Sequence, residues 1–299
     1  MPAQSHILPL THAGHACLQL STRHGTAIVA LHGAQVLSWV PIGHRDVLWL
    51  SPNAQLAPGA AIRGGVPICW PWFGKQGMPE GAMQHGPVRN RPWEVASVQA
   101  DSTEGISLTL VPCRATNPDD PLTRFAAHLP LTLQIDLGET LVQTLATRNQ
   151  GPQPFALTQA LHSYFAVQDA SQVLVPELAG LYYDDKLSGA TQQLQQGPFV
   201  LARACDRIYQ QPGTAPARHY TLEDRAWQRR IHITAQGSQS LVVWNPGLEQ
   251  ARTMADVPDA EWCNFLCLEA ANAGPDVVLL RPGAQHRLTQ TLAVESWRT

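Results

Sequence analysis

The sequence predicts an all-β protein, organised as one large antiparallel β-sandwich with few short helices. Apolar and polar residues alternate strictly over residues 131–137, and short apolar runs recur along the chain between Gly, Pro, Asn and Asp clusters. The 24 prolines and 22 glycines are spread along the chain without a low-complexity linker. This pattern favours stacked antiparallel sheets over alternating βαβ units, and the 299 residues are compatible with a single domain spanning 1–299.

The clearest element is a β-hairpin over residues 131–149, in which Gly138 and Glu139 form the turn. A short helical piece is expected around residues 258–264, because Pro258 suits a first helical turn. Residues 117–121 and 210–218 are expected to be exposed loops. Shorter strands are expected at residues 28–31, 36–40, 47–50, 93–98, 106–111, 155–161, 230–234, 241–244, 265–269, 277–280 and 288–294.

Composition argues against several classes of function. The formal net charge is -3 and no run of Lys or Arg occurs, so nucleic-acid binding is not expected. The N-terminus lacks a basic stretch followed by a long apolar core, and no apolar run reaches the ~18 residues of a membrane span, so we expect a cytoplasmic protein that does not bind membranes. The six cysteines are dispersed without paired metal-ligand spacing, which favours reduced thiols and no metal.

The segment AIRGGVPICWPWFG places Arg63 among groups that are mostly apolar. Consecutive glycines allow unusual backbone conformations, and Pro67 and Pro71 stiffen the chain. One interpretation is a tight crossover whose apolar side chains are buried while Arg63 forms a surface salt bridge. The other is a cleft into which Arg63 points.

Such a cleft would suit a sugar, because sugar C–H faces pack on aromatic rings and hydroxyls need polar partners. Trp70, Trp72 and Phe73 are candidates for the aromatic face. Arg63, together with Arg89 in the nearby segment QHGPVRN, adds planar charged donors that match phosphate oxygens. The two arginines are therefore consistent with a phosphorylated sugar.

Two titratable residues follow or end apolar, strand-like runs. His162 follows such a run in FALTQALHSYF, and is interpreted either as a half-buried histidine bonded to backbone or as a catalyst. Glu269 ends one in NFLCLEAAN, where a buried carboxylate needs a partner. That partner is either a neighbouring arginine, or the carboxylate is a general base with a raised pKa.

Lysine is rare in this chain. Lys75 and Lys186 are the only two, and all other cationic side chains apart from histidine are arginine. We interpret the two lysines as scattered surface residues of a composition biased towards arginine.

Five segments, in this order and at these separations, resemble the D-hexose-6-phosphate mutarotases (glucose-6-phosphate 1-epimerases) of the aldose 1-epimerase-like superfamily. These are RGGVPICWPWFG, QHGPVRN, ALHSYF, YYDDK and CLEAAN. The segments HGAQVLSWVP and VLWLSP are similar to that family as well, so the resemblance spans residues 32–294. It implies a galactose mutarotase-like β-supersandwich that exchanges the α and β anomers of a hexose 6-phosphate, with no metal or organic cofactor.

The resemblance also implies residue roles. His162 matches the family's general acid and Glu269 its general base. Between Asp184 and Asp185 of YYDDK we choose Asp185, because it directly precedes Lys186. Trp70 and Trp72 depart from the Phe or Gln of many relatives, which implies a pocket of different shape. The substrate-binding positions are Arg63, Gln84, Arg89 and Asp185.

The expected partner is a small-molecule sugar phosphate, bound by a monomer. Three alternatives remain open at this point. A mutarotase of unphosphorylated aldoses would not need the arginine pair, and a non-catalytic carbohydrate-binding sandwich would not need the acid and base. A cupin-like metal enzyme would need a tight His-x-His pattern with a nearby carboxylate, which the sequence lacks.

Overall fold

The computed structural model describes residues 5–12, 15–54, 59–101, 105–114, 125 and 127–297. Within these residues the chain forms antiparallel sheets joined by loops and short helices, as predicted. The helices are α2 (Gly247–Ala251) and the 3₁₀ turns η1 (Val88–Asn90), η2 (Ala170–Gln172), η3 (Pro176–Leu178) and η4 (Glu261–Asn264). None of the helices formed by described residues has both the length and the apolar character needed to cross a membrane.

Two of the sheets contain four and nine strands. The first contains, in spatial order, β1 (His6–His12), β2 (His15–Thr22), β3 (Gly25–Ala30) and β4 (Gln35–Pro41). The second contains nine strands, in the order β16 (Phe199–Val200), β13 (Val173–Val175), β18 (Arg218–Asp224), β19 (Arg229–Gln236), β23 (Gln285–Ser296), β9 (Leu141–Arg148), β8 (Leu131–Leu137), β7 (Gly105–Pro112) and β6 (Trp93–Asp101).

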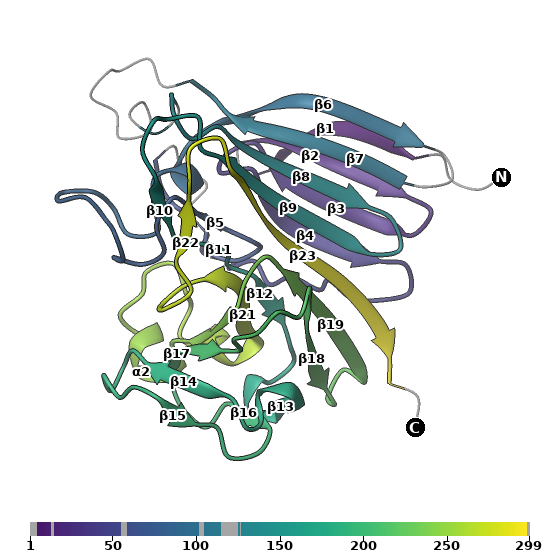
Figure 1. The fold of residues 1–299 in the computed structure, drawn as a ribbon. Helices are drawn as coiled ribbons and strands as arrows, with labels where there is room; N and C mark the ends of the chain where they lie inside the picture. Colours follow the sequence, from purple (N-terminus) through teal and green to yellow (C-terminus); the bar gives the residue numbers. More distant parts are fainter. Residues whose placement is uncertain are drawn as a thin grey trace.

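The third sheet carries the candidate site. Its order is β15 (Gln193–Leu194), β14 (Tyr182–Asp185), β17 (Cys205–Gln210), β20 (Ser240–Asn245), β21 (Phe265–Asn272), β11 (Gln159–Leu161) and β5 (Ile68–Cys69), and β12 (Tyr164–Ala166) also pairs with β21. A separate ladder joins β10 (Phe155–Leu157) to β22 (Val278–Leu280). Figure 1 shows β1–β4 behind β6–β9, and the long β23 running from this region down to β18 and β19.

Burial explains why these strands stack. In β8 every second residue from Leu131 to Leu137 is buried and the residues between are partly exposed. The buried residues belong to one core cluster, which also takes Leu20 and Val29 from the four-stranded sheet and Leu266 and Leu268 from β21. The core therefore extends between all three sheets, which suits the large apolar fraction of the sequence.

The hairpin over residues 131–149 is confirmed as β8 and β9, and most shorter predicted strands are present. Two predictions need correction. The strand over 155–161 is divided into β10 and β11, and residues 47–50 form only isolated bridges at Leu48 and Leu50. The short helical piece expected around 258–264 is present as the 3₁₀ helix η4. The predicted loop at 117–121 lies outside the described residues.

Candidate active site

Strand register brings His162 and Glu269 together. β11 and β12 both pair with β21, through Leu161 opposite Ala270 and Tyr164 opposite Cys267. Continuing this register through the two residues between β11 and β12 sets His162 opposite Glu269. Their side chains converge, with His162 Nε2 3.3 Å from Glu269 Oε1. Two residues far apart in sequence thus form one cross-strand pair.

Glu269 is an unusual carboxyl group, because it is fully buried and neither of its oxygens has a hydrogen-bond partner among the described residues. Its 3.3 Å approach to His162 is therefore a close contact without hydrogen-bond alignment. Burial raises the pKa of Glu269 well above its ordinary value; the negative charge of Asp206 adds to this effect and Arg89 opposes it. The salt bridge to a neighbouring arginine that would give a structural explanation is not present among the described residues.

The pKa of His162 is displaced in the opposite direction. Burial lowers the pKa of His162 well below its ordinary value, and His85, Arg89 and Arg63 lower it further. The imidazole stacks on the ring of Tyr164 at 4.9 Å between centroids, and the backbone N–H donates to Pro67 O at 3.0 Å. Because the two displacements favour a neutral pair, we treat His162 and Glu269 as one unit that carries a single proton at neutral pH.

The pair opens into a cavity of about 810 Å³, within the range of small-molecule sites. Its lining combines charged, aromatic and aliphatic groups. The polar and aromatic lining residues are Arg63, Phe73, Lys75, Gln76, Gln84, His85, Arg89, His162, Tyr164, Asp184, Lys186, Asp206, Trp244, Gln250 and Glu269.

Alternation along the strands decides which aspartates face this cavity. Asp206 and Ile208 on β17 line it, as do Val242 and Trp244 on β20, two residues apart in each case. Burial raises the pKa of Asp206, with Lys186 opposing this effect and Asp185 adding to it. Asp206 was missed by the sequence analysis because the polar run CDRIYQ gave no strand signal.

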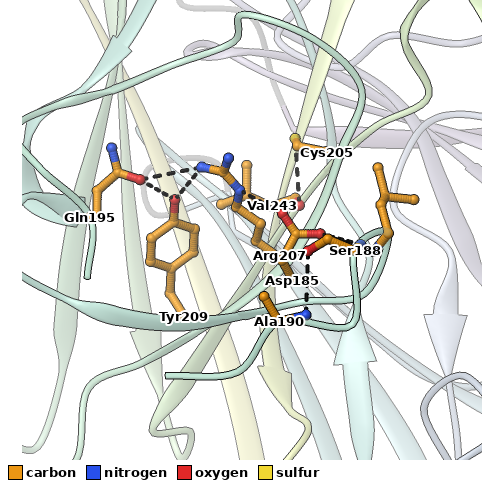
Figure 2. Close-up of polar contacts among 9 residues, drawn as sticks. Asp185, Ser188, Ala190, Gln195, Cys205, Arg207, Tyr209 and Val243 are labelled. Atoms are coloured by element: carbon orange, nitrogen blue, oxygen red, sulfur yellow. Dashed lines mark hydrogen bonds and ion pairs between the residues drawn. The ribbon is translucent and has the colours of Figure 1, made fainter. Parts of the chain in front are cut away.

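Asp185 is not among the residues that line the cavity, which corrects the sequence-based choice between the two aspartates. In β14 it has the opposite orientation to Asp184, which does line the cavity. Asp185 Oδ1 accepts from the backbone N–H groups of Leu187 and Ser188, at 2.9 and 3.0 Å, and its Oδ2 lies 3.6 Å from Arg207 Nε. Figure 2 shows Asp185 in this turn, with Arg207 held by Tyr209 and Gln195.

The consecutive glycines position Arg63. Gly64 and Gly65 have φ values of 109° and 60°, and a Cβ on either would lie within 2.4 Å of a backbone oxygen, so no other residue fits. The backbone of this crossover therefore lies directly against the backbone at Trp49 and Val36. Arg63 both lines the cavity and pairs: its Nε donates to Asp256 Oδ2 at 2.9 Å and its Nη1 to Tyr164 Oη at 2.9 Å. The two sequence-based interpretations of Arg63 are thus combined.

The second predicted segment lies against the first. His85, with φ of 64°, accepts at Nδ1 from Gly74 N at 3.3 Å, and its pKa is lowered to about 3 by burial and by Arg89 and Arg63. It is therefore neutral and carries its proton on Nε2. Arg89 and Gln84 line the cavity, and Arg89 Nε is buried without a hydrogen-bond partner among the described residues. This orphan donor is suited to an anionic ligand.

The aromatic face differs from the one predicted. Trp70 is fully buried and donates from Nε1 to Thr147 Oγ1 at 2.9 Å, and Trp72 Nε1 donates to Met83 O at 2.9 Å. Of the three predicted aromatics only Phe73 lines the cavity, where Tyr164 and Trp244 provide the other rings. Tyr164 and Trp244 lie on strands, and their cavity-facing orientation needed the sheet to be assembled.

The described residues contain no cluster of three or more His, Cys, Asp or Glu side chains arranged to hold a metal ion. The cysteines among them are unpaired, and burial raises the pKa of Cys69 and Cys267, so these two remain thiols.

Replacing Glu269 by Gln should change how stability depends on pH. A carboxyl whose pKa is raised on folding stabilises the native state fully below its unfolded pKa, and this contribution is lost as pH rises. Glutamine cannot ionise, so Glu269→Gln should gain stability relative to wild type between about pH 5 and 8, with each kcal/mol raising Tm by about 2 °C. Thermal unfolding at several pH values measures this. The exposed Glu94→Gln is the control, and a parallel Tm profile for Glu269→Gln would contradict the expectation.

The fold, together with an acid–base pair at a cavity, suits an isomerase that acts on sugars. Comparison with known proteins points to the same class of enzyme. Residues 16–293 match the family described as Aldose 1-epimerase. The chain therefore belongs to the aldose 1-epimerase family, whose members are isomerase-type enzymes.

Individual relatives are more specific. The chain is 34% identical over 271 residues to an Escherichia coli K12 protein named "Putative glucose-6-phosphate 1-epimerase", covering 90% of this chain and 86% of that one. A Cenchrus ciliaris protein of the same name is 32% identical over 276 residues, covering 89% and 80%. The crystal structure of "a putative mutarotase" from Salmonella typhimurium superposes with a TM-score of 0.85 at 30% identity, covering 97% of this chain and 94% of that one. The galactose mutarotase-like fold is thus confirmed.

Proposed function

We propose that this protein interconverts the α and β anomers of a hexose 6-phosphate, with glucose 6-phosphate as its substrate, by acid–base-catalysed opening and closure of the sugar ring. The observation that carries the proposal is the His162–Glu269 pair, which is buried and lines a cavity that is also lined by Arg89, whose Nε has no hydrogen-bond partner among the described residues. The names of the 34% and 32% identical relatives support the same substrate.

Ring opening requires two proton transfers at oxygens bonded to the same carbon. Glu269 as carboxylate removes the proton of the O1 hydroxyl, while His162 as imidazolium protonates the ring oxygen O5 and the C1–O5 bond breaks. The proton shared by the pair lies on His162 in this reactive form. Because O1 and O5 are both attached to C1, two groups 3.3 Å apart on one side of the sugar can reach both, so they need not lie on opposite sides.

Closure uses the same groups in reverse. The open-chain aldehyde rotates about C1–C2 and presents its other face. His162 then takes the proton of the O5 hydroxyl, and Glu269 returns a proton to O1, which restores both groups without net proton uptake. Neutral His85, whose ring centre lies 5.9 Å from that of His162, adds a hydrogen-bond donor through its Nε2–H.

The remaining lining residues bind and orient the sugar. Arg63, Gln84 and Arg89 are assigned to the phosphate end, where fork-shaped donors match phosphate oxygens. Asp206 replaces Asp185 in our assignment as the acceptor for sugar hydroxyls, because it lines the cavity. Trp244 provides an apolar face for the ring carbons.

Two other functions leave part of the site unexplained. A mutarotase of unphosphorylated aldoses would leave Arg89 Nε without a partner, and a non-catalytic sugar-binding protein would leave the cost of burying Glu269 unexplained.

Magnetisation-exchange NMR decides among them. Anomer exchange is measured with glucose 6-phosphate, galactose 6-phosphate and free glucose side by side, against a blank without protein. Acceleration mainly of a phosphorylated sugar supports the proposal. Acceleration of free glucose alone would identify the unphosphorylated alternative, and no acceleration with any sugar would reject catalysis of this kind.

A further inference from the structure

Both lysines of this chain line the same cavity. Lys75 precedes the loop that leads to Gln84, and Lys186 follows β14, yet each contributes to the lining of the site that contains His162 and Glu269. Both side chains are exposed, as predicted, but they are not scattered. Apart from histidine, the other cationic residues of the lining are Arg63 and Arg89. These two arginines are only partly exposed, so they are more buried than the two lysines.

The backbone at Lys75 is held firmly. Its neighbour Gln76 makes two hydrogen bonds with Gly274, in which Gln76 Nε2 donates to the carbonyl at 2.7 Å and Gln76 Oε1 accepts from the N–H at 3.0 Å. On its other side Gly74 donates to His85, and Gly74 O accepts from His85 N at 2.9 Å. The Lys75 side chain therefore leaves from a defined point at the edge of the cavity.

Lys186 is held in a similar way. Its backbone N–H donates to Asp206 O at 2.7 Å, and the turn that follows is closed by the Asp185 carboxylate, which accepts from Leu187 and Ser188. The Asp185 side chain, which does not line the cavity, thus fixes the turn that presents Lys186.

The two ammonium groups are available for a ligand. No carboxylate of a described residue lies within ion-pair distance of either one. Arg63 differs, since its Nε and Nη1 are occupied by Asp256 and Tyr164. Lys186 acts electrostatically on the Asp206 carboxylate without forming an ion pair with it, so the ammonium groups of both lysines can still contact an incoming dianion.

We propose that Lys75 and Lys186 are specificity-determining residues that bind the phosphate group from the mouth of the cavity, while Arg89 binds it from inside. This inference rests on the proposed function. Ammonium groups are hydrated point charges, so their contribution is long-ranged, depends on charge more than on shape, and is screened by salt. They raise the capture of phosphorylated over unphosphorylated sugars.

The first test is the double variant Lys75→Gln/Lys186→Gln. At low ionic strength its kcat/KM for glucose 6-phosphate should fall about 5- to 10-fold, and the dependence on salt should flatten, while kcat/KM for free glucose changes far less. Lys75→Arg/Lys186→Arg should retain most of the wild-type value. Arg281→Gln, which removes an exposed charge outside the cavity lining, is the matched control. Equal values and equal salt dependence for wild type and the Gln double variant would overturn the proposal.

Chemical modification offers an independent test, because only these two side chains and the N-terminal amine carry primary amines. Acetylation, which neutralises the amines, should lower activity on glucose 6-phosphate, and reductive dimethylation, which keeps the charge, should not. Glucose 6-phosphate should protect both lysines from acetylation in peptide mass spectrometry. Equal loss of activity with both reagents, or labelling that the sugar phosphate leaves unchanged, would contradict the inference.

Calorimetric binding of glucose 6-phosphate separates this inference from the proposed function. If wild type binds the compound but does not exchange its anomers, the proposed function fails, and weaker binding by the Gln double variant still supports the lysine contact. If wild type exchanges the anomers and the double variant binds equally well, the proposed function stands and the lysine contact fails. Failure of wild type to bind it would reject both.

Discussion

Replacing His162 by Ala or Glu269 by Gln is expected to abolish anomer exchange. Each positioned acid or base typically contributes about 10²- to 10⁴-fold in rate, and neither group can act without its partner. Either variant should therefore reduce kcat/KM for glucose 6-phosphate by about 10²-fold or more, towards the rate of the blank.

Exchange NMR on the two variants and on Glu94→Gln measures this effect. Glu94 is exposed on β6, so its variant should behave as wild type. Calorimetric binding of glucose 6-phosphate should persist in Glu269→Gln, because this variant keeps the residues assigned to the phosphate in the cavity lining. Near-normal exchange in either catalytic variant would show that the assignment is wrong.

Arg89→Ala is expected to discriminate between substrates. Hydrogen bonds to charged groups contribute about 1.5–3 kcal/mol, so losing this guanidinium should lower kcat/KM for glucose 6-phosphate about 10- to 100-fold. Free glucose has no group for Arg89 to pair with, and its kcat/KM should fall much less. The effect acts through binding and orientation, since the phosphate lies away from the reacting carbon.

Comparing both sugars in the same variant separates recognition from misfolding. A folding defect lowers both values together, whereas loss of phosphate recognition lowers only one. Arg281→Ala, an exposed arginine outside the cavity, should leave both values unchanged. Equal losses on both sugars in Arg89→Ala would reject phosphate recognition by this residue.

Some strands could be predicted from the sequence and others could not, and the difference has a physical reason. β8 and β9 were predictable because one face is buried, which imposes alternation on the sequence. β14 and β17 were not, because each has polar residues on both faces: Asp184 faces the cavity and Asp185 a charged turn. Where both faces of a strand are polar, periodicity carries no signal, and Asp206 was missed for the same cause.

The sequence by itself determined the all-β class, the family resemblance, and the two residues that form the candidate acid–base pair. The all-β class follows from local patterns, since alternating residues and turn residues lie within a few positions of one another. The roles of His162 and Glu269 are implied by the family resemblance, which rests on the order and separation of short motifs along the chain. Only the tertiary structure decided which side chains share the cavity. Which residues line the cavity depends on strand register and on the face of the sheet that each residue occupies. In the folded chain Lys75 and Lys186 line the cavity, whereas Trp70 and Asp185 do not.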